Sequence, residues 1–315
     1  MNAVLTLTAT LFFGADVAPT ADVLVVVGAP GTPEYGKQFD EWASRWEQAA
    51  QRGGASVTLL GRAAEAVPTD RERWQTALER AAEERQRPLW LVLIGHGTFD
   101  RRTAKFNLRG PDVSAADLAG WLSRLERPVA VIDCTSASAP FLAAVSGPKR
   151  IVITATKGGH EQNFARFGDF LSQALTDPLA DLDKDEQVSL WEAFLAASRR
   201  TAEYYQTDGR LQTEHALLDD NGDGQGTRAD EFVGLQPAPQ AQSRAAALDG
   251  TLAHQWHLIP SPAESALPHD VRTRRDAIEL QVVALRRRKS ELPETEYYAQ
   301  LEALLVELAK LSLGK

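Results

Sequence analysis

The chain has 315 residues, enough for one large domain with an appendage or for two domains. Its 34 Lys and Arg residues against 43 Asp and Glu residues give a formal net charge of -9. This charge argues against nucleic acid as a partner, because binding to phosphates needs clustered cations. The only cysteine, Cys134, excludes an internal disulfide and every zinc site built from several cysteines.

Residues 1–21 have two interpretations. A short apolar stretch followed by small residues has the outline of a secretory signal peptide, without the usual positively charged start. Alternating apolar and β-branched residues in the same stretch favour an N-terminal strand instead. The first interpretation favours an extracytoplasmic protein. No later apolar run reaches the roughly 18 residues of a membrane span.

From residue 22 onward, apolar runs alternate with amphipathic stretches. The apolar runs predict buried strands, at 22–28, 56–61, 88–97, 129–133 and 150–156. Helical periodicity predicts the intervening helices, at 38–51, 70–85 and 114–125, the last with Ser114 as its N-cap. This alternation predicts an α/β domain with a mainly parallel sheet, spanning residues 22–205.

The composition changes beyond residue 205. Residues 206–235 form an acidic segment rich in Asp and Gly, and 236–269 have the composition of a linker. Residues 270–315 predict two helices separated by Pro293. Each helix carries one apolar stripe, at residues 278, 282 and 285 in the first and at 301, 304, 305 and 308 in the second. We therefore expect a helical hairpin that packs on the main domain or mediates contact with another protein chain.

One loop has the spacing of a phosphate-binding loop. The stretch GTPEYGKQ follows the first predicted strand and contains two glycines and Lys37 at that spacing. A true phosphate loop continues with Ser or Thr, whereas Gln38 follows here, and Pro33 removes one of the N–H groups that would bind phosphate. A P-loop nucleotide hydrolase is therefore a distant alternative.

Two predicted strand ends carry residues suited to acyl transfer. His96 ends the run at 88–97, and Cys134 follows the run at 129–133. The carboxyl ends of neighbouring parallel strands face one crevice, and an imidazole beside a thiol favours the reactive thiolate. The N–H of Gly97, with that of Cys134, would serve as an oxyanion donor. We therefore predict a catalytic dyad, against the alternative that a lone cysteine is an inert core residue.

Three short motifs follow one another at the ends of predicted strands: IGHG, a later strand ending in Asp-Cys, and ITAT at the next strand end. They resemble the motifs of the caspase-like (clan CD) cysteine peptidases, closest to the legumain-type family and its bacterial homologues. This resemblance implies a three-layer α/β/α sandwich and a cysteine endopeptidase acting on peptide or protein substrates. It matches His96 to the catalytic histidine, Cys134 to the nucleophile and Gly97 to the oxyanion glycine. It places further residues near the substrate: Asp133, Thr154, Thr156 and Glu161.

The chain departs from the legumain pattern around Cys134. Legumain-like sequences usually have Glu-Ala or a similar small pair before the nucleophile and Ser-Gly after it. Here Asp133 precedes the cysteine, and Thr135, Ser136 and Ala137 follow. A catalytically inactive caspase-like protein, acting as a calcium-stabilised binding or scaffold module, is the alternative function.

Two acidic segments, 181–192 and 219–230, match the spacing of calcium loops, with oxygen-bearing residues at positions one, three, five, nine and twelve. The first has Glu186 where a glycine is expected at position six. The second has Asp230 at position twelve, where the longer glutamate is usual. We expect structural Ca2+ at one or both loops, against the alternative of acidic surface turns, and no organic cofactor. The candidate ligands are Asp181, Asp183, Asp185, Gln187, Ser189, Glu192, Asp219, Asn221, Asp223, Gln225, Thr227 and Asp230.

Overall fold

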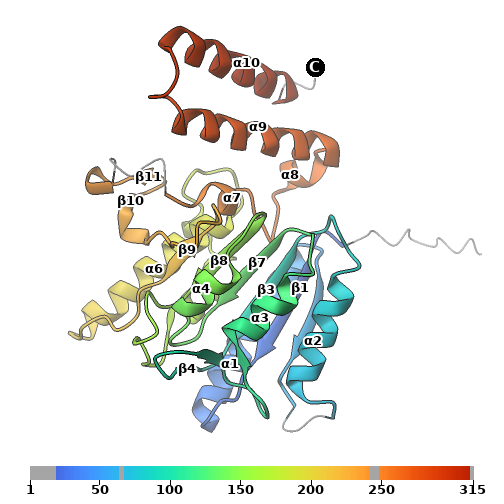
Figure 1. Ribbon diagram of the computed structural model, residues 1–315, viewed down its shortest axis with the longest axis vertical. Helices are drawn as coiled ribbons and strands as arrows, with labels where there is room; N and C mark the ends of the chain where they lie inside the picture. Colours follow the sequence, from blue (N-terminus) through green and yellow to red (C-terminus); the bar gives the residue numbers. More distant parts are fainter. Residues whose placement is uncertain (1–18, 64–66, 242–247, 313–315) are drawn as a thin grey trace, which may run out of the picture.

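The computed structural model describes residues 19–63, 67–241 and 248–312. The predicted signal peptide or N-terminal strand therefore lies outside the described residues, apart from its last three. In the described part, a six-stranded sheet lies between two layers of helices, and a pair of long helices stands on one side of this sandwich (Figure 1).

The sheet has the strand order β2-β1-β3-β7-β8-β9. Its strands are β1 (Asp22–Val27), β2 (Ser56–Leu60), β3 (Leu89–Ile94), β7 (Val129–Asp133), β8 (Arg150–Thr154) and β9 (Leu217–Asp219). All neighbouring strands are parallel except β8 and β9. The strands β3 and β7 are buried at every position, which explains why their sequences are continuous apolar runs.

Helices cover both faces of the sheet. One core lies under α1 (Pro33–Arg52), α5 (Phe167–Ala174) and α6 (Leu190–Thr207). The other lies under α2 (Asp70–Ala81), α3 (Ala115–Leu122) and α4 (Ala139–Val145). Ser114 caps α3 as predicted, accepting from the N–H of Asp117. The predicted three-layer α/β/α sandwich with a mainly parallel sheet is confirmed.

The candidate phosphate loop is helical. Helix α1 begins at Pro33, five residues earlier than predicted, because Thr32 accepts a hydrogen bond from the N–H of Tyr35 and Pro33 suits the first turn of a helix. Gly36 and Lys37 thus lie inside α1. No loop is left between them and Gly31 to surround a phosphate, so the structure argues against the P-loop alternative.

The strand predicted at 88–97 is two elements. β3 ends at Ile94, and the chain turns through Gly95 and His96 into β4 (Gly97–Phe99). β4 begins a small antiparallel sheet with β5 (Ala104–Phe106) and β6 (Val113–Ser114).

The predicted end of the domain at 205 and the predicted linker at 236–269 were wrong. Strand β9 lies beyond residue 205 and is part of the central sheet. Trp256 and Leu258 of the supposed linker lie in the core beside α1 and α6. The segment contains short elements: β11 (Gln236–Pro237), which pairs with β10 (Phe232–Val233), α7 (Thr251–His254) and α8 (Pro262–Ala266).

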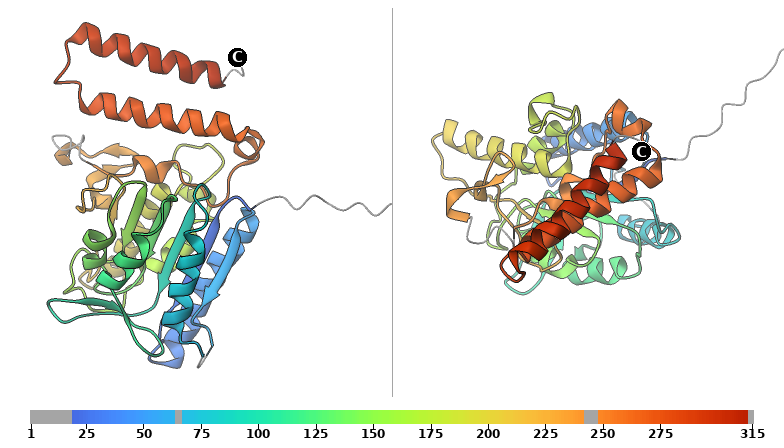
Figure 2. Two further views of the ribbon diagram at one scale, coloured as in Figure 1. Left: turned by 45° about the vertical axis from the view of Figure 1, so that its right-hand side comes forward. Right: turned by 90° about the horizontal axis from the view of Figure 1, so that it is seen from above.

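The chain ends in the predicted hairpin, made of α9 (His269–Arg287) and α10 (Glu294–Ser312), which stands off the sandwich (Figures 1 and 2). Ile278, Val282 and Leu285 of α9 are buried, as their spacing predicted. Within the described residues, no helix combines the length and the apolar character that crossing a membrane requires.

Candidate functional site

His96 and Cys134 both lie at the carboxyl-terminal ends of the central strands. β3 and β7 are parallel neighbours, with Leu93 paired to Asp133, and the N–H of Cys134 donates to the carbonyl of Leu93 at 3.0 Å. Both candidate catalytic residues therefore follow the carboxyl ends of adjacent strands, as the sequence predicted.

The side chain of Cys134 points into the core. It is 1% exposed and lies in the apolar cluster under α1 and α5. Gly168 of α5 is so close that a Cβ there would lie 2.6 Å from the Cβ of Cys134 and 3.1 Å from its Sγ. Burial, and then the charges of Asp133 and Glu214, raise the pKa of the Cys134 thiol well above its ordinary value. Burial therefore disfavours the thiolate and shields the sulfur from solvent.

His96 lies among aromatic rings. Its ring centroid is 4.8 Å from that of Tyr35 and 5.2 Å from that of Phe39. Its Nε2 lies 3.1 Å from the carbonyl oxygen of Pro30, which can only accept, so Nε2 carries a proton. Among the described residues, no hydrogen bond joins His96 to Cys134. The structure brings the two residues to neighbouring strand ends without forming a dyad.

Gly97 makes room for the loop that follows β7. Its N–H donates to Ser136 Oγ at 3.3 Å, and the Ser136 hydroxyl donates back to the Gly97 carbonyl at 3.1 Å. A Cβ on Gly97 would lie 2.1 Å from the Ser136 carbonyl oxygen and 2.8 Å from Thr135 Oγ1. The N–H predicted to stabilise an oxyanion thus already has a partner in the protein.

Three of the predicted substrate contacts are fully buried: Asp133, Thr154 and Thr156. One oxygen of Asp133 accepts from the N–H and the hydroxyl of Thr135, at 3.0 and 2.6 Å, while its Oδ2 has no partner. Burial raises the pKa of Asp133 to about 6. Thr154 donates to the Thr156 carbonyl, and Thr156 Oγ1 accepts from the N–H of Ala139. These side chains form hydrogen bonds at the ends of β7 and β8 and do not face solvent.

The fourth predicted contact, Glu161, holds neighbouring loops together. Its Oε1 lies 2.6 Å from His215 Nδ1, and its Oε2 accepts from the N–H of Lys157 at 2.9 Å. Its backbone carbonyl accepts from the N–H of Ala137 at 2.8 Å. Glu161 therefore connects the loop after β8 to the loop after β7 and to His215, two residues before β9.

A buried acid that the sequence did not reveal lies beside this site. Glu214 is 1% exposed and accepts from the N–H groups of Arg166 and Phe167 at the start of α5 and from the hydroxyl of Tyr205. Burial raises its pKa. Glu214 thus fixes the start of the helix that covers Cys134. It lies far along the chain from α5, so local sequence held no signal for this contact.

Two cavities lie in the described part of the chain. One of about 380 Å³ borders α6 and is lined by Leu179, Leu195 and Phe232 among others. A second, of about 230 Å³, is lined by residues that include Tyr35, Phe164 and Arg166. Neither is lined by His96 or Cys134.

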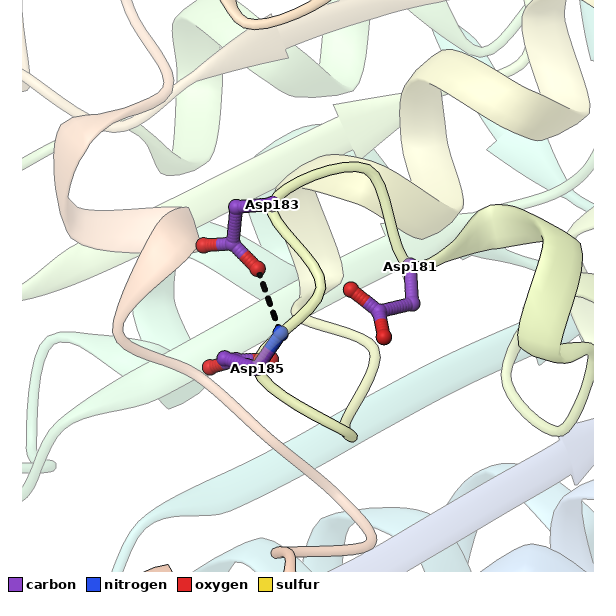
Figure 3. A group of neighbouring side chains, drawn as sticks. All are labelled: Asp181, Asp183 and Asp185. Carbon is purple, nitrogen blue, oxygen red and sulfur yellow. Dashed lines mark hydrogen bonds between the residues drawn. The ribbon is translucent and has the colours of Figure 1, made fainter.

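The first acidic segment, loop 1 (residues 181–192), brings three carboxylates together. One oxygen from each of Asp181, Asp183 and Asp185 lies within 4.8 Å of the others. Figure 3 shows all three on one turn of the chain, with the Asp183 carboxylate accepting from the N–H of Asp185. Two oxygens bound to one Ca2+ lie at most about 5 Å apart, so this cluster fits a single hard cation.

Loop 1 and the second acidic segment, loop 2 (residues 219–230), have the same backbone geometry. In both loops, the side chain of the acid at position one accepts hydrogen bonds from the backbone N–H groups of positions four and six. The side chain at position three accepts from the N–H of position five, and the side chain at position five accepts from the N–H of position seven. Positions four and six have positive φ in both loops, namely Lys184 (64°), Glu186 (70°), Gly222 (80°) and Gly224 (73°). Loop 1 therefore adopts this conformation with Lys184 and Glu186 at the two positions where loop 2 has glycines.

A similar acid closes each loop, but in loop 2 it is not the predicted one. In loop 1, Glu192 accepts from the N–H groups at positions two and three and from the position-nine hydroxyl of Ser189. In loop 2, Asp249 accepts from the same three positions, at 3.0, 3.2 and 2.7 Å, the last from Thr227. Asp230, the predicted position-twelve residue, is exposed and pairs with Arg228. The sequence interpretation missed Asp249 because it lies outside the twelve-residue spacing.

The segment 248–261, which contains Asp249, connects the two loops. Near loop 2, the N–H of Ala253 donates to Asp220. Near loop 1, His254 Nε2 lies 3.3 Å from the Asp183 carboxylate, and the N–H of Ser261 donates to the Gln187 side chain. The chain then continues through α8 into the hairpin, so the loops anchor the base of the C-terminal helices.

No protein-family model matches the chain, and no curated protein matches it. Several solved structures are similar to part of it. The Drosophila initiator caspase Dronc is 12% identical with a TM-score of 0.43, and the match covers 66% of this chain and 83% of Dronc. Protein GSU0716 from Geobacter sulfurreducens is 13% identical with a TM-score of 0.42, over 66% of this chain and 97% of that protein. Caspase-1 from Spodoptera frugiperda is 9% identical with a TM-score of 0.40, over 64% and 86%.

These similarities concern the fold alone. At 9% to 13% identity, neither the activities nor the residues of those proteins transfer to this chain. The legumain-type specificity stays an expectation.

Proposed function

We propose that this chain is a catalytically inactive, caspase-like binding or scaffold protein. The observation that carries the proposal is the burial of Cys134 beneath α5, without a hydrogen bond to His96. A thiol acts as a nucleophile only as the thiolate, and burial without a cationic partner disfavours that form.

The surroundings of the strand ends support the same proposal. An acyl-transfer site needs a free oxyanion donor and a pocket for the substrate. Here the Gly97 N–H is bonded to Ser136, and the buried hydroxyls of Thr154 and Thr156 bond to their neighbours. The Gly97 N–H and the two threonine hydroxyls thus have structural partners in the folded chain.

A cysteine endopeptidase acting through His96 and Cys134 is the second candidate, favoured by the position of both residues after adjacent parallel strands. For this function, the start of α5 has to move away from Cys134, because Gly168 lies against the thiol. His96 also has to leave the Pro30 carbonyl. Such a rearrangement would make activity depend on an activating step.

A positional-scanning library of fluorogenic peptides, assayed with and without Ca2+, separates the two candidates. We expect the wild-type chain to cleave no faster than the Cys134→Ala variant on any peptide. Cleavage by the wild type that is lost in Cys134→Ala and in His96→Ala would contradict the inactive assignment and support the endopeptidase.

We propose further that loops 1 and 2 bind structural Ca2+. Carboxylate oxygens are the donors that this hard cation prefers, and Asp181, Asp183 and Asp185 lie close enough to share one ion. Asp219, Asn221 and Asp223 hold the same positions in loop 2. Burial, and then the charges of Glu192 and Asp185, raise the pKa of Asp183, which indicates repulsion between these acids. A bound cation would offset that repulsion and order the segment that leads into the hairpin.

Addition of about 1 mM Ca2+, a concentration that fills even weak calcium modules, is expected to raise the midpoint of thermal unfolding, because a ligand that binds only the folded state stabilises it. Differential scanning calorimetry checks the shift, with EGTA to reverse it. Asp183→Asn should reduce the shift, and Glu203→Gln, an exposed acid on α6, should leave it unchanged. An equal midpoint in Ca2+ and in EGTA would contradict the calcium proposal.

A further inference from the structure

The larger cavity of the protein, about 380 Å³ beside α6, is called the α6 cavity. Its walls come from segments that are distant in the sequence: α6, residues 212–216 before β9, residues 228–230 at the end of loop 2, and β10. Figure 1 shows these elements at the β9 edge of the sheet. Cavities that hold small ligands have volumes of about 300 to 1,000 Å³, so the α6 cavity has the size of a small-molecule site.

The wall of the α6 cavity is largely apolar. Leu195 and Ala216 line it and are buried members of the core beneath α6. Phe232 also lines it, and its ring centroid lies 4.7 Å from that of Trp191, which holds the phenyl ring in place. Leu179 lines it too and is 78% exposed. Apolar surface that is open to water in this way favours an apolar ligand, because burial of both surfaces releases water.

The titratable side chains that line the α6 cavity are mostly basic. Three of the four are Arg199, His215 and Arg228, and the fourth is Asp230. The Arg199 and Arg228 side chains are 69% and 42% exposed, so their guanidinium groups lie toward the mouth of the cavity and the buried apolar residues lie deeper. Guanidinium groups bind carboxylates through paired hydrogen bonds. The lining therefore suits a ligand with an apolar body and an anionic group.

The existing partners of these basic groups leave them able to bind a ligand. Arg199 pairs with Glu203 at 3.3 Å, and Arg228 pairs with Asp230. Both pairs are exposed and therefore weak, because water screens them, and a guanidinium has further N–H groups to donate. His215 Nδ1 lies 2.6 Å from the Glu161 carboxylate, while its Nε2 has no hydrogen-bond partner in the described part of the chain.

We propose that the α6 cavity binds a small amphipathic carboxylate, such as a medium-chain alkyl carboxylate. The alkyl chain lies against Leu195 and Phe232, and the carboxylate lies at Arg199 and Arg228. A cationic ligand is a poorer occupant, because it would face more basic than acidic side chains. The proposal depends neither on the chemistry of Cys134 nor on Ca2+ at the two loops.

Isothermal titration of the full chain with decanoate, in buffer without Ca2+, tests the site, and decan-1-ol serves as the neutral probe. We expect saturable binding of one decanoate per chain and at least about tenfold weaker binding of decan-1-ol, because a hydrogen bond to a charged group contributes about that factor. Absence of decanoate binding at about 1 mM would overturn the proposal. Equal affinity for the two probes would overturn the carboxylate as the ligand class.

Removal of the two guanidinium groups tests the anionic end of the site. The double variant Arg199→Gln, Arg228→Gln is expected to weaken decanoate binding at least about tenfold and to leave decan-1-ol binding unchanged. Arg124→Gln is the matched control, because Arg124 is also an exposed arginine in an ion pair, with Glu79, and does not line the cavity. It should bind decanoate as the wild type does.

Two further variants test the position of the ligand. Ala202 is half-buried and lines the cavity, so the side chain added in Ala202→Phe should fill it and abolish binding of both probes. Leu179→Glu places an acid beside the ligand and should weaken decanoate binding at least about tenfold. Its matched control is Val67→Glu, at a fully exposed residue shortly before α2, which should bind normally.

Far-UV circular dichroism checks that every variant is folded. Leu179 is exposed, so its variant tests the site even where Ala202→Phe does not fold. Decanoate binding that is unchanged in folded Ala202→Phe or in Leu179→Glu would locate the ligand elsewhere and overturn the proposal.

Discussion

Replacement of Gly97 by alanine is expected to lower the free energy of unfolding by about 3 kcal/mol, at the upper end of overpacking costs. The new methyl group would lie 2.1 Å from the Ser136 carbonyl oxygen. That oxygen belongs to the backbone of a buried loop, so it cannot move aside as the end of a flexible side chain can. The paired hydrogen bonds between Gly97 and Ser136 would be strained as well.

Urea unfolding followed by tryptophan fluorescence measures the loss. Gly120→Ala in α3 is the matched control, because nothing lies within 4 Å of the added methyl group. That variant should be as stable as the wild type or slightly more stable. If Gly97→Ala kept the wild-type stability while a peptidase activity disappeared, Gly97 would be an oxyanion residue and its structural role would be refuted.

Removal of the Asp249 carboxylate is expected to cost about 3 kcal/mol, because Asp249→Ala leaves the N–H groups of Asp220 and Asn221 and the Thr227 hydroxyl without their buried acceptor. Asp230→Ala is the matched control in the same loop. Its carboxylate is 62% exposed, so we expect a change within about 0.5 kcal/mol.

The same two variants separate the roles of these acids in cation binding. Isothermal titration with Ca2+ is expected to show a weakened second site in Asp249→Ala and unchanged binding in Asp230→Ala. If Asp230→Ala lowered the free energy of unfolding or the Ca2+ affinity more than Asp249→Ala does, Asp230 would be the acid that closes loop 2.

The sheet and its covering helices could be predicted because each depends on local pattern. The runs at 129–133 and 150–154 are short, rich in Val and Ile and apolar at nearly every position, as expected for strands buried on both faces. The cap at Ser114 and the stripe of Ile278, Val282 and Leu285 likewise depend on residues within a few turns of one another. The structure agrees with the sequence at each of these positions.

The candidate site was less predictable, because its state depends on contacts between distant segments. The sequence places Cys134 after a strand, but its burial depends on Gly168, which lets α5 approach the thiol. The partner of Gly97 comes from the loop after β7, and Asp249 reaches loop 2 from beyond the twelve-residue pattern. The supposed linker is polar on average, yet Trp256 and Leu258 fix it to the core. None of these contacts has a local sequence signal.

The reaction of Cys134 with iodoacetamide tests the assignment of an inert thiol most directly. In the folded protein at neutral pH, we expect labelling to be more than about a hundredfold slower than in the urea-unfolded chain. Burial keeps the reagent away from the sulfur, and it raises the pKa of the thiol so that less of the reactive thiolate forms. The rate should be unchanged in His96→Ala. Labelling of the folded protein faster than that of the unfolded thiol, and lost in His96→Ala, would show an activated nucleophile and contradict the account.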